Sequence, residues 1–134
     1  MIYVLDTNII SYMLNGDAEI RDCYRQESDK GHQFAIPPIV YYEIQQWLIA
    51  RGIKRKTEMF ALLISQMEQK DFDWSVWHKA AEIQAKLIRS GKKIGDADVL
   101  IAAYCILNDY TLVTNNTRHF EHVECLGYVN WKSE

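Results

Sequence analysis

The sequence lacks three features that mark specialised classes of protein. No apolar run approaches the roughly 20 residues that a helix needs to cross a bilayer. Residues 1–6 have no basic start of the kind that signal peptides carry, and they reach an acid at once. The three cysteines form no CxxC pair or metal-finger spacing, and an odd, scattered set is typical of reduced thiols. We therefore expect a soluble, cytoplasmic protein with no membrane partner and with Cys105 as a small core residue.

The sequence also has no excess of basic residues, no repeats, no low-complexity tract and no linker. With 134 residues, 49% of them apolar, the chain is predicted to fold as one domain over residues 1–134. A formal net charge of −3 is not typical of a nucleic-acid-binding protein. Two local basic clusters can nevertheless contact phosphates, or simply form solvated helix ends. They are Arg51, Lys54, Arg55 and Lys56, and Arg89, Lys92 and Lys93.

Short apolar runs alternate with longer amphipathic stretches along the chain. The runs predict strands at 3–5, 34–36 and 111–114, with weaker signals at 71–74 and 128–130. The stretches predict helices at 9–14, 38–52, 57–70, 75–91 and 97–107, with Ser75 as a cap and glycines 16, 52 and 91 at helix ends. This alternation predicts an α/β fold whose mostly parallel sheet is covered by helices on both faces.

Three carboxylates follow or interrupt apolar segments. Asp6 ends the first strand, Glu43 lies among apolar helical residues, and Asp98 precedes an apolar helical run. Ligands gather outside the carboxyl ends of parallel strands, so we expect these acids to converge there. Their mutual repulsion requires a cation, and hard oxygen ligands favour Mg²⁺ or Mn²⁺. Metal-assisted hydrolysis of a phosphodiester is one reaction for such a cluster. Metal binding alone and helix capping are the alternatives.

Four short segments stand in a specific order along the chain. They are VLDTN at 4–8, the stretch at 36–44, IGDADVLIAA at 94–103 and LVTNNTRHF at 112–120. In order and spacing they resemble the VapC-type toxins of the PIN-domain family over essentially the whole chain, and residues 126–131 resemble the usual ending of such toxins. The resemblance implies a PIN-like three-layer α/β/α sandwich.

This resemblance also implies roles for the polar residues. Asp6, Glu43 and Asp98 match the metal-binding acids of the family. Asn116 matches a fourth position that is Asp or Asn, and Thr7 matches a hydroxyl that supports the first carboxylate or a water. Such proteins are Mg²⁺- or Mn²⁺-dependent endoribonucleases of toxin–antitoxin pairs. They are commonly homodimers, and the tail of a small antitoxin fills their acidic groove. The implied substrate is RNA, with transfer RNA as one of the targets to consider.

Two features depart from the pattern of the family. Asp96 precedes Asp98 by two residues, at a position that is often not acidic. It can cap the following helix or act as an additional acid near the metal. Pro37 and Pro38 stand where Ser or Thr is common, which can alter the approach of Glu43.

The residues leave other functions open. A non-catalytic PIN-like scaffold is expected where the acids are incomplete, and Asn116 keeps that alternative open. A phosphatase with an aspartyl nucleophile ranks low, because such enzymes usually carry a second acid two residues after the first, where this chain has Asn8. Arg118 is a candidate phosphate contact. His119 is a candidate contact to RNA or to a water at the metal, or else a surface histidine.

Overall fold

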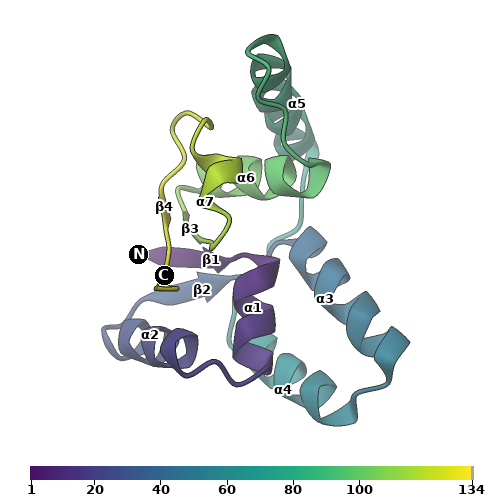
Figure 1. Ribbon diagram of the computed structural model, residues 1–134, viewed down its shortest axis with the longest axis vertical. Coiled ribbons are helices and arrows are strands. Elements are labelled where there is room, and N and C mark those ends of the chain that lie inside the picture. The colour runs from purple at the N-terminus through teal and green to yellow at the C-terminus, as the bar shows by residue number, and fades with distance from the viewer. Residues whose placement is uncertain (134) are drawn as a thin grey trace.

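A parallel sheet flanked by helices forms the frame of the protein (Figure 1). The computed structural model describes residues 1–133. The strands are β1 (Ile2–Leu5), β2 (Gln33–Ala35), β3 (Thr111–Val113) and β4 (Tyr128–Val129), in the order β2-β1-β3-β4. Each neighbouring pair is parallel. The predicted α/β class with a mostly parallel sheet is confirmed, and β1 lies inside the sheet.

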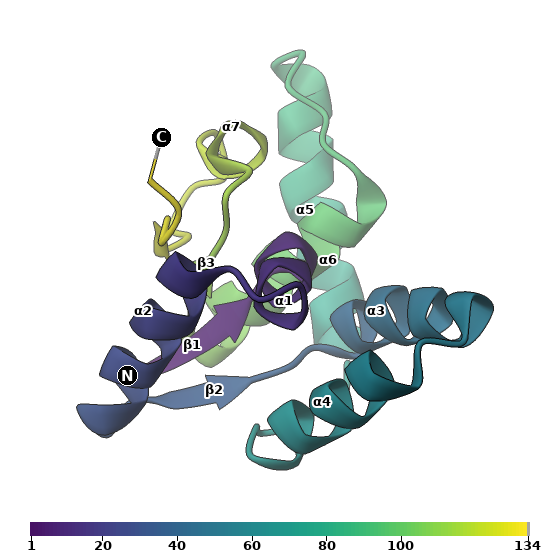
Figure 2. The same ribbon diagram turned by 60° about the horizontal axis from the view of Figure 1, so that its bottom comes forward.

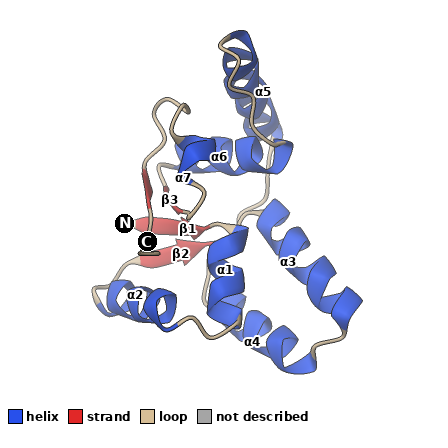
Figure 3. Cartoon of the chain, in the orientation of Figure 1, coloured by secondary structure: helices blue, strands red, loops and turns tan. Residues whose placement is uncertain are grey.

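The helices occupy most of the remaining chain, as Figure 3 shows in blue. They are α1 (Thr7–Leu14), α2 (Ala18–Asp29), α3 (Pro38–Arg51), α4 (Lys54–Ser65), α5 (Trp74–Arg89), α6 (Asp96–Asn108) and α7 (Thr117–Phe120). The predicted helix at 57–70 begins and ends earlier, as α4. Gly52 ends α3 with a left-handed φ of 62°, as expected for a glycine at that position. Among residues 1–133, no helix combines the length and apolarity needed to span a membrane.

The structure corrects two predictions and adds a helix that the sequence pattern did not predict. Helix α2 was missed because most of its residues are polar and Ile20 is its one buried residue. Residues 71–73 form no strand, and α5 begins at Trp74. The cap of α5 is Asp73 rather than Ser75, since the Asp73 carboxylate accepts the Ser75 N–H at 2.9 Å.

The core lies around β1 and α6. Tyr3, Val4 and Leu5 of β1 are buried, and the seven consecutive α6 positions 99–105 are buried too. A helix that is apolar on all sides packs inside a fold rather than on its surface. Each fully buried large apolar side chain contributes about 1.5–3 kcal/mol. Cys105 is fully buried, as predicted, and burial raises the pKa of its thiol. This packing fixes the end of β1 and the start of α6, the two places from which Asp6 and Asp98 extend.

Candidate metal-binding active site

Asp6 stands at the carboxyl end of β1 and caps α1. Its own N–H donates to the Val113 carbonyl of β3 at 2.9 Å, so the sheet holds its backbone. One carboxylate oxygen accepts the Thr7 N–H at 2.7 Å, and the other accepts the Thr114 hydroxyl at 2.8 Å. Only 3% of the residue is exposed. Asp6 therefore serves as a helix cap and is also held rigidly at the edge where ligands bind in parallel sheets.

The charges around Asp6 oppose its ionisation. Burial is the main cause that raises the pKa of Asp6 above its ordinary value. The hydrogen bonds from Thr114 and Thr7 lower that pKa, while the nearby carboxylates of Asp98 and Glu43 raise it again. Both hydrogen bonds come from neutral groups, and both neighbouring charges are negative. Asp98 and Glu43 therefore lie near enough to Asp6 for their charges to affect its ionisation.

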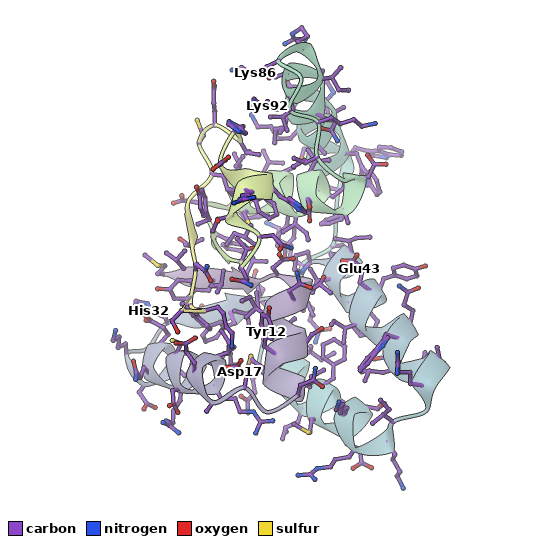
Figure 4. The ribbon with its side chains drawn as sticks, in the orientation of Figure 1. Tyr12, Asp17, His32, Glu43, Lys86 and Lys92 are labelled. Atoms are coloured by element: carbon purple, nitrogen blue, oxygen red, sulfur yellow. The ribbon has the colours of Figure 1, made fainter. Side chains whose placement is uncertain are left out.

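Glu43 approaches from α3, a helix that begins beside the end of the sheet. In Figure 2 the arrowheads of β1 and β2 point toward the side where α1 and α3 begin. Pro37 occupies the cap position of α3 and Pro38 its first residue, a position that tolerates proline because no helical N–H is needed there. Figure 4 shows Glu43 near this starting end. Its Oε1 accepts the Thr7 hydroxyl at 2.7 Å. The two prolines thus do not keep Glu43 away from α1.

Asp98 lies in the first turn of α6 and is held by His119. The Nδ1 of His119 and the Oδ2 of Asp98 are 2.7 Å apart. The side chain of Asp98 is 20% exposed and that of His119 is 54% exposed. A carboxylate in the first turn also interacts favourably with the helix dipole. His119 is thus on the surface, and it is in contact with one of the predicted metal-binding acids. Arg118, its neighbour on α7, is exposed.

The structure tests one of the two roles predicted for Asp96. The cap of α6 is Gly95, without a side-chain cap bond, and Asp96 is the first residue of the helix. The prediction that Asp96 caps α6 is therefore wrong. Its role as an additional acid near the metal stays a prediction.

Thr114 is a site residue that sequence reasoning missed. Its hydroxyl donates to Asp6 and accepts the Asn116 N–H at 3.0 Å, and the residue is fully buried. Asn116 occupies the cap position of α7 without a side-chain cap bond. Asn115 donates from its amide to the Tyr12 hydroxyl at 3.2 Å, which links this loop to α1. The sequence carries no distinctive signal for Thr114, because its role depends on β3 lying beside β1, the strand that leads to Asp6.

The donor set suits a hard divalent cation. Within residues 1–133, no group of three or more His, Cys, Asp or Glu side chains is spaced closely enough to hold a metal ion as the side chains stand. Thr7 holds Glu43, and His119 holds Asp98. Nevertheless, a buried carboxylate next to two others is strongly disfavoured without a compensating cation. Carboxylate oxygens are the ligands that Mg²⁺ and Mn²⁺ prefer, so Asp6, Glu43 and Asp98 fit such an ion chemically.

Comparison with known proteins identifies the family of this chain. The model of the PIN domain family matches residues 3–124. Ribonuclease VapC2 of Rickettsia felis is 32% identical over 133 residues, which is 98% of each chain. The tRNA(fMet)-specific endonuclease VapC of Shigella flexneri is 27% identical over 131 residues, 96% of this chain and 97% of that protein.

A solved structure extends the similarity to three dimensions. The crystal structure of VapBC2 from Rickettsia felis bound to a DNA fragment from their promoter contains a chain with a TM-score of 0.89 and 30% identity. The match covers 98% of this chain and all of that one. Family match, full-length relatives and fold agree that this chain belongs to the PIN-domain family and, within it, to the VapC ribonuclease toxins of VapBC toxin–antitoxin pairs.

Proposed function

We propose that this ribonuclease hydrolyses RNA phosphodiesters with Mg²⁺ or Mn²⁺ held by Asp6, Glu43 and Asp98. The observation that carries the proposal is the Asp6 carboxylate, whose pKa is raised by burial and by the nearby carboxylates of Asp98 and Glu43, and which receives hydrogen bonds from neutral groups alone. A divalent ion at this place would supply Lewis acidity, lowering the pKa of a bound water and stabilising charge on the phosphate. Asn116 is proposed as a fourth, neutral ligand or as a contact to the substrate.

The chain's own residues would orient the acids. The Thr114 hydroxyl and the Thr7 N–H fix the two oxygens of Asp6. The Thr7 hydroxyl holds Glu43, and His119 holds Asp98. Such supporting contacts matter because losing one typically lowers metal affinity or activity by about 10–100-fold. Asp96, exposed at the start of α6, is proposed as an additional acid near the ion.

A direct test compares aspartates at the two ends of α6. Asp98→Asn should abolish Mg²⁺-dependent cleavage of total RNA while the protein stays folded by circular dichroism. Asp109→Asn is the matched control, because Asp109 caps the other end of α6 with a left-handed φ of 56° that asparagine also adopts. We expect full activity in the control. Full activity in Asp98→Asn would refute the proposed site.

Isothermal titration with Mn²⁺ separates the enzyme from a scaffold. The proposal expects binding to the wild-type chain and its loss in Asp98→Asn. No binding at millimolar Mn²⁺, together with no cleavage, would instead favour the non-catalytic PIN-like module.

The partners of this chain are proposed from its relatives. The Rickettsia felis structure is of a VapBC2 pair on promoter DNA, so we propose that a small cognate antitoxin binds and silences this chain. The relative from Shigella flexneri is a tRNA(fMet)-specific endonuclease, and transfer RNA is therefore the first substrate to test. We also propose a homodimer, which sedimentation equilibrium would detect. Co-expression with the protein encoded beside the gene would test the antitoxin.

A further inference from the structure

A pocket with a basic lining lies next to Asp98. Its volume is about 340 Å³, and its walls come from the loop between α5 and α6 and from α7 and the residues that follow it. The side chains and backbone that matter here are Lys92, Lys93, Gly95, Arg118, His119 and His122. The pocket therefore combines three permanent cations with two imidazoles. None of its lining residues is an acid.

The loop that forms one wall is fixed in place. Gly91 ends α5 with a left-handed φ of 72°, and the Lys92 N–H donates back to the Leu87 carbonyl at 2.8 Å. Gln84 of α5 is buried, and its amide holds Ile94 on both sides. Its Nε2 donates to the Ile94 carbonyl at 2.6 Å, and its Oε1 accepts the Ile94 N–H at 3.2 Å. The backbone that carries Lys92 and Lys93 is thus preorganised rather than loose.

The pocket and the acidic site share a wall. His119 lines the pocket and contacts the Asp98 Oδ2 at 2.7 Å. Gly95 lines the pocket too, and a Cβ built on Gly95 would lie 3.9 Å from that same oxygen. A ligand that occupies the pocket therefore ends within a few atoms of a proposed metal ligand.

The cations of the pocket are free to bind a ligand. Within the part of the chain that the structure describes, Lys92, Lys93 and Arg118 form no ion pair. The imidazole of His122 is 3.2 Å from the Glu121 carboxylate. All three cationic side chains belong to exposed residues, and Figure 4 labels Lys92 beside the upper part of α5.

Two of the four members of the other basic cluster, Arg51 and Lys56, are engaged within the protein. Arg51 and Lys56 lie over the ring of Trp47, at 5.1 and 5.6 Å from its centroid. Lys56 also donates to the Asn15 side chain, which links α4 to the end of α1. These contacts give Arg51 and Lys56 a structural role that needs no ligand.

An RNA strand bound near three carboxylates needs cations close by. Three carboxylates repel the phosphates that flank the cleaved one, and binding to single-stranded RNA depends mainly on neutralising phosphates. Extending the nuclease function proposed above, we propose that this pocket binds RNA phosphates adjacent to the one that is cleaved. It thereby positions one bond of the strand over Asp6, Glu43 and Asp98. An acidic protein segment is the competing occupant.

The test measures RNA binding without cleavage. A 5′-fluorescein single-stranded 12-mer RNA is titrated with protein in EDTA and followed by fluorescence anisotropy at several salt concentrations. We expect Lys92→Gln/Lys93→Gln to weaken binding about 10-fold near 0.1 M salt and to reduce the slope of log K against log salt by about 0.7 for each lost contact. Arg118→Gln should act in the same direction. Melting curves confirm that the variants are folded.

The matched control is Lys54→Gln/Arg55→Gln, which removes the same charge from exposed residues at the start of α4. It should bind RNA as the wild type does. The proposal is overturned if both double variants weaken binding equally, or if the Lys92/Lys93 variant binds RNA normally. It is also overturned if the Lys92/Lys93 substitutions abolish binding of a polyglutamate peptide and leave RNA binding intact.

Cleavage assays then separate this proposal from the nuclease proposal. If the wild type cleaves RNA, the pocket variants should raise KM with little change in kcat. Normal cleavage with unchanged RNA binding in those variants overturns the proposal for the pocket and leaves the nuclease proposal intact. Absence of cleavage in the wild type, with RNA binding weakened in the pocket variants, overturns the nuclease proposal and supports the pocket.

Discussion

Asp6 and Asp17 cap the first two helices of the protein, and their surroundings are opposite. Asp6 accepts the Thr7 N–H at the start of α1, and Asp17 accepts the Ile20 N–H at the start of α2. Burial and two nearby carboxylates raise the pKa of Asp6. The carboxylate of Asp17 instead accepts a hydrogen bond from the Lys132 ammonium, which lowers its pKa.

The difference shows how one residue type at one helix position serves stability or function. Lys132 pairs with Asp17 and also lies over the Tyr12 ring, 5.0 Å from its centroid, so this corner stabilises the fold through its own contacts. Asp6 forms no ion pair among residues 1–133, and burial together with two nearby carboxylates outweighs its hydrogen bonds and makes ionisation in the metal-free protein unfavourable. Residues that reduce stability in this way concentrate at functional sites.

Replacing each aspartate by asparagine should give the largest difference between the two sites. Asparagine keeps a cap oxygen at either position, so helix capping is not what changes. Asp6→Asn should lower the initial rate of RNA cleavage by more than about 100-fold, because loss of a supporting contact alone lowers activity by about 10–100-fold. Asp17→Asn should leave the rate unchanged. Equal losses in the two variants would show that general destabilisation, rather than a site, explains the effect.

Removing the hydrogen bond that orients Asp6 should have the next largest effect. Thr114→Val keeps the shape of the side chain and removes the hydroxyl that donates to Asp6 and accepts the Asn116 N–H. We expect cleavage to fall by about 10–100-fold. Thr114→Ser, which keeps the hydroxyl, should recover most of the rate. If the serine variant is as inactive as the valine variant, the methyl group matters and not the hydrogen bond.

A divalent metal ion should stabilise the folded protein through Asp6 and not through Asp17. Adding Mg²⁺ or Mn²⁺ at about 100 times its Kd should add about 2.7 kcal/mol to the free energy of unfolding of the wild type. Scanning calorimetry with and without EDTA should show this shift in Asp17→Asn and not in Asp6→Asn. A shift that persists in Asp6→Asn would place the ion elsewhere.

The pH dependence of stability should have opposite signs at the two aspartates, with the smallest effects of the series. The folded-state pKa of Asp17 is lowered, so its contribution is present above the ordinary aspartate pKa and is lost as pH falls through the folded pKa. The folded-state pKa of Asp6 is raised, so the metal-free protein loses stability as pH rises from the ordinary pKa through the folded one.

Thermal unfolding in EDTA between about pH 2 and pH 8 would measure both trends. With rising pH, the melting temperature of Asp6→Asn should move above that of the wild type, while that of Asp17→Asn should move below it. If the melting temperatures of the two variants change with pH in parallel, Asp6 and Asp17 do not have opposite electrostatic environments.

The acids could be predicted from the sequence because they contrast with their neighbours. Asp6, Glu43 and Asp98 interrupt apolar segments, and a carboxylate in such a place is costly without a role. Thr114 could not be singled out in the same way, since threonine at the end of a strand has many ordinary uses. Its role depends on β1 and β3 being neighbours, which brings residues 108 positions apart into contact.

The fold was predictable where apolar patterns were strong and unpredictable where single contacts decide. The buried run of α6 and the apolar β1 were found from their sequence alone. Helix α2 was not, because most of its residues are polar and its start is fixed by an individual polar contact, that of Asp17. The strand predicted at 71–74 does not form. Before it, Glu68 forms an isolated bridge with Ala35, and residues 71–73 add no strand to the sheet.

The three cysteines form a graded set of chemical reporters. Cys125 is exposed, Cys23 is half-buried, and Cys105 lies in the centre of α6, close enough to Asp6 for its charge to raise the thiol pKa further. The thiolate is the form that alkylating reagents attack, so Cys105 is protected both by access and by ionisation. The rate of Cys105 alkylation, followed by mass spectrometry, would therefore report how often α6 separates from the sheet. A divalent ion at the acidic site should slow that alkylation.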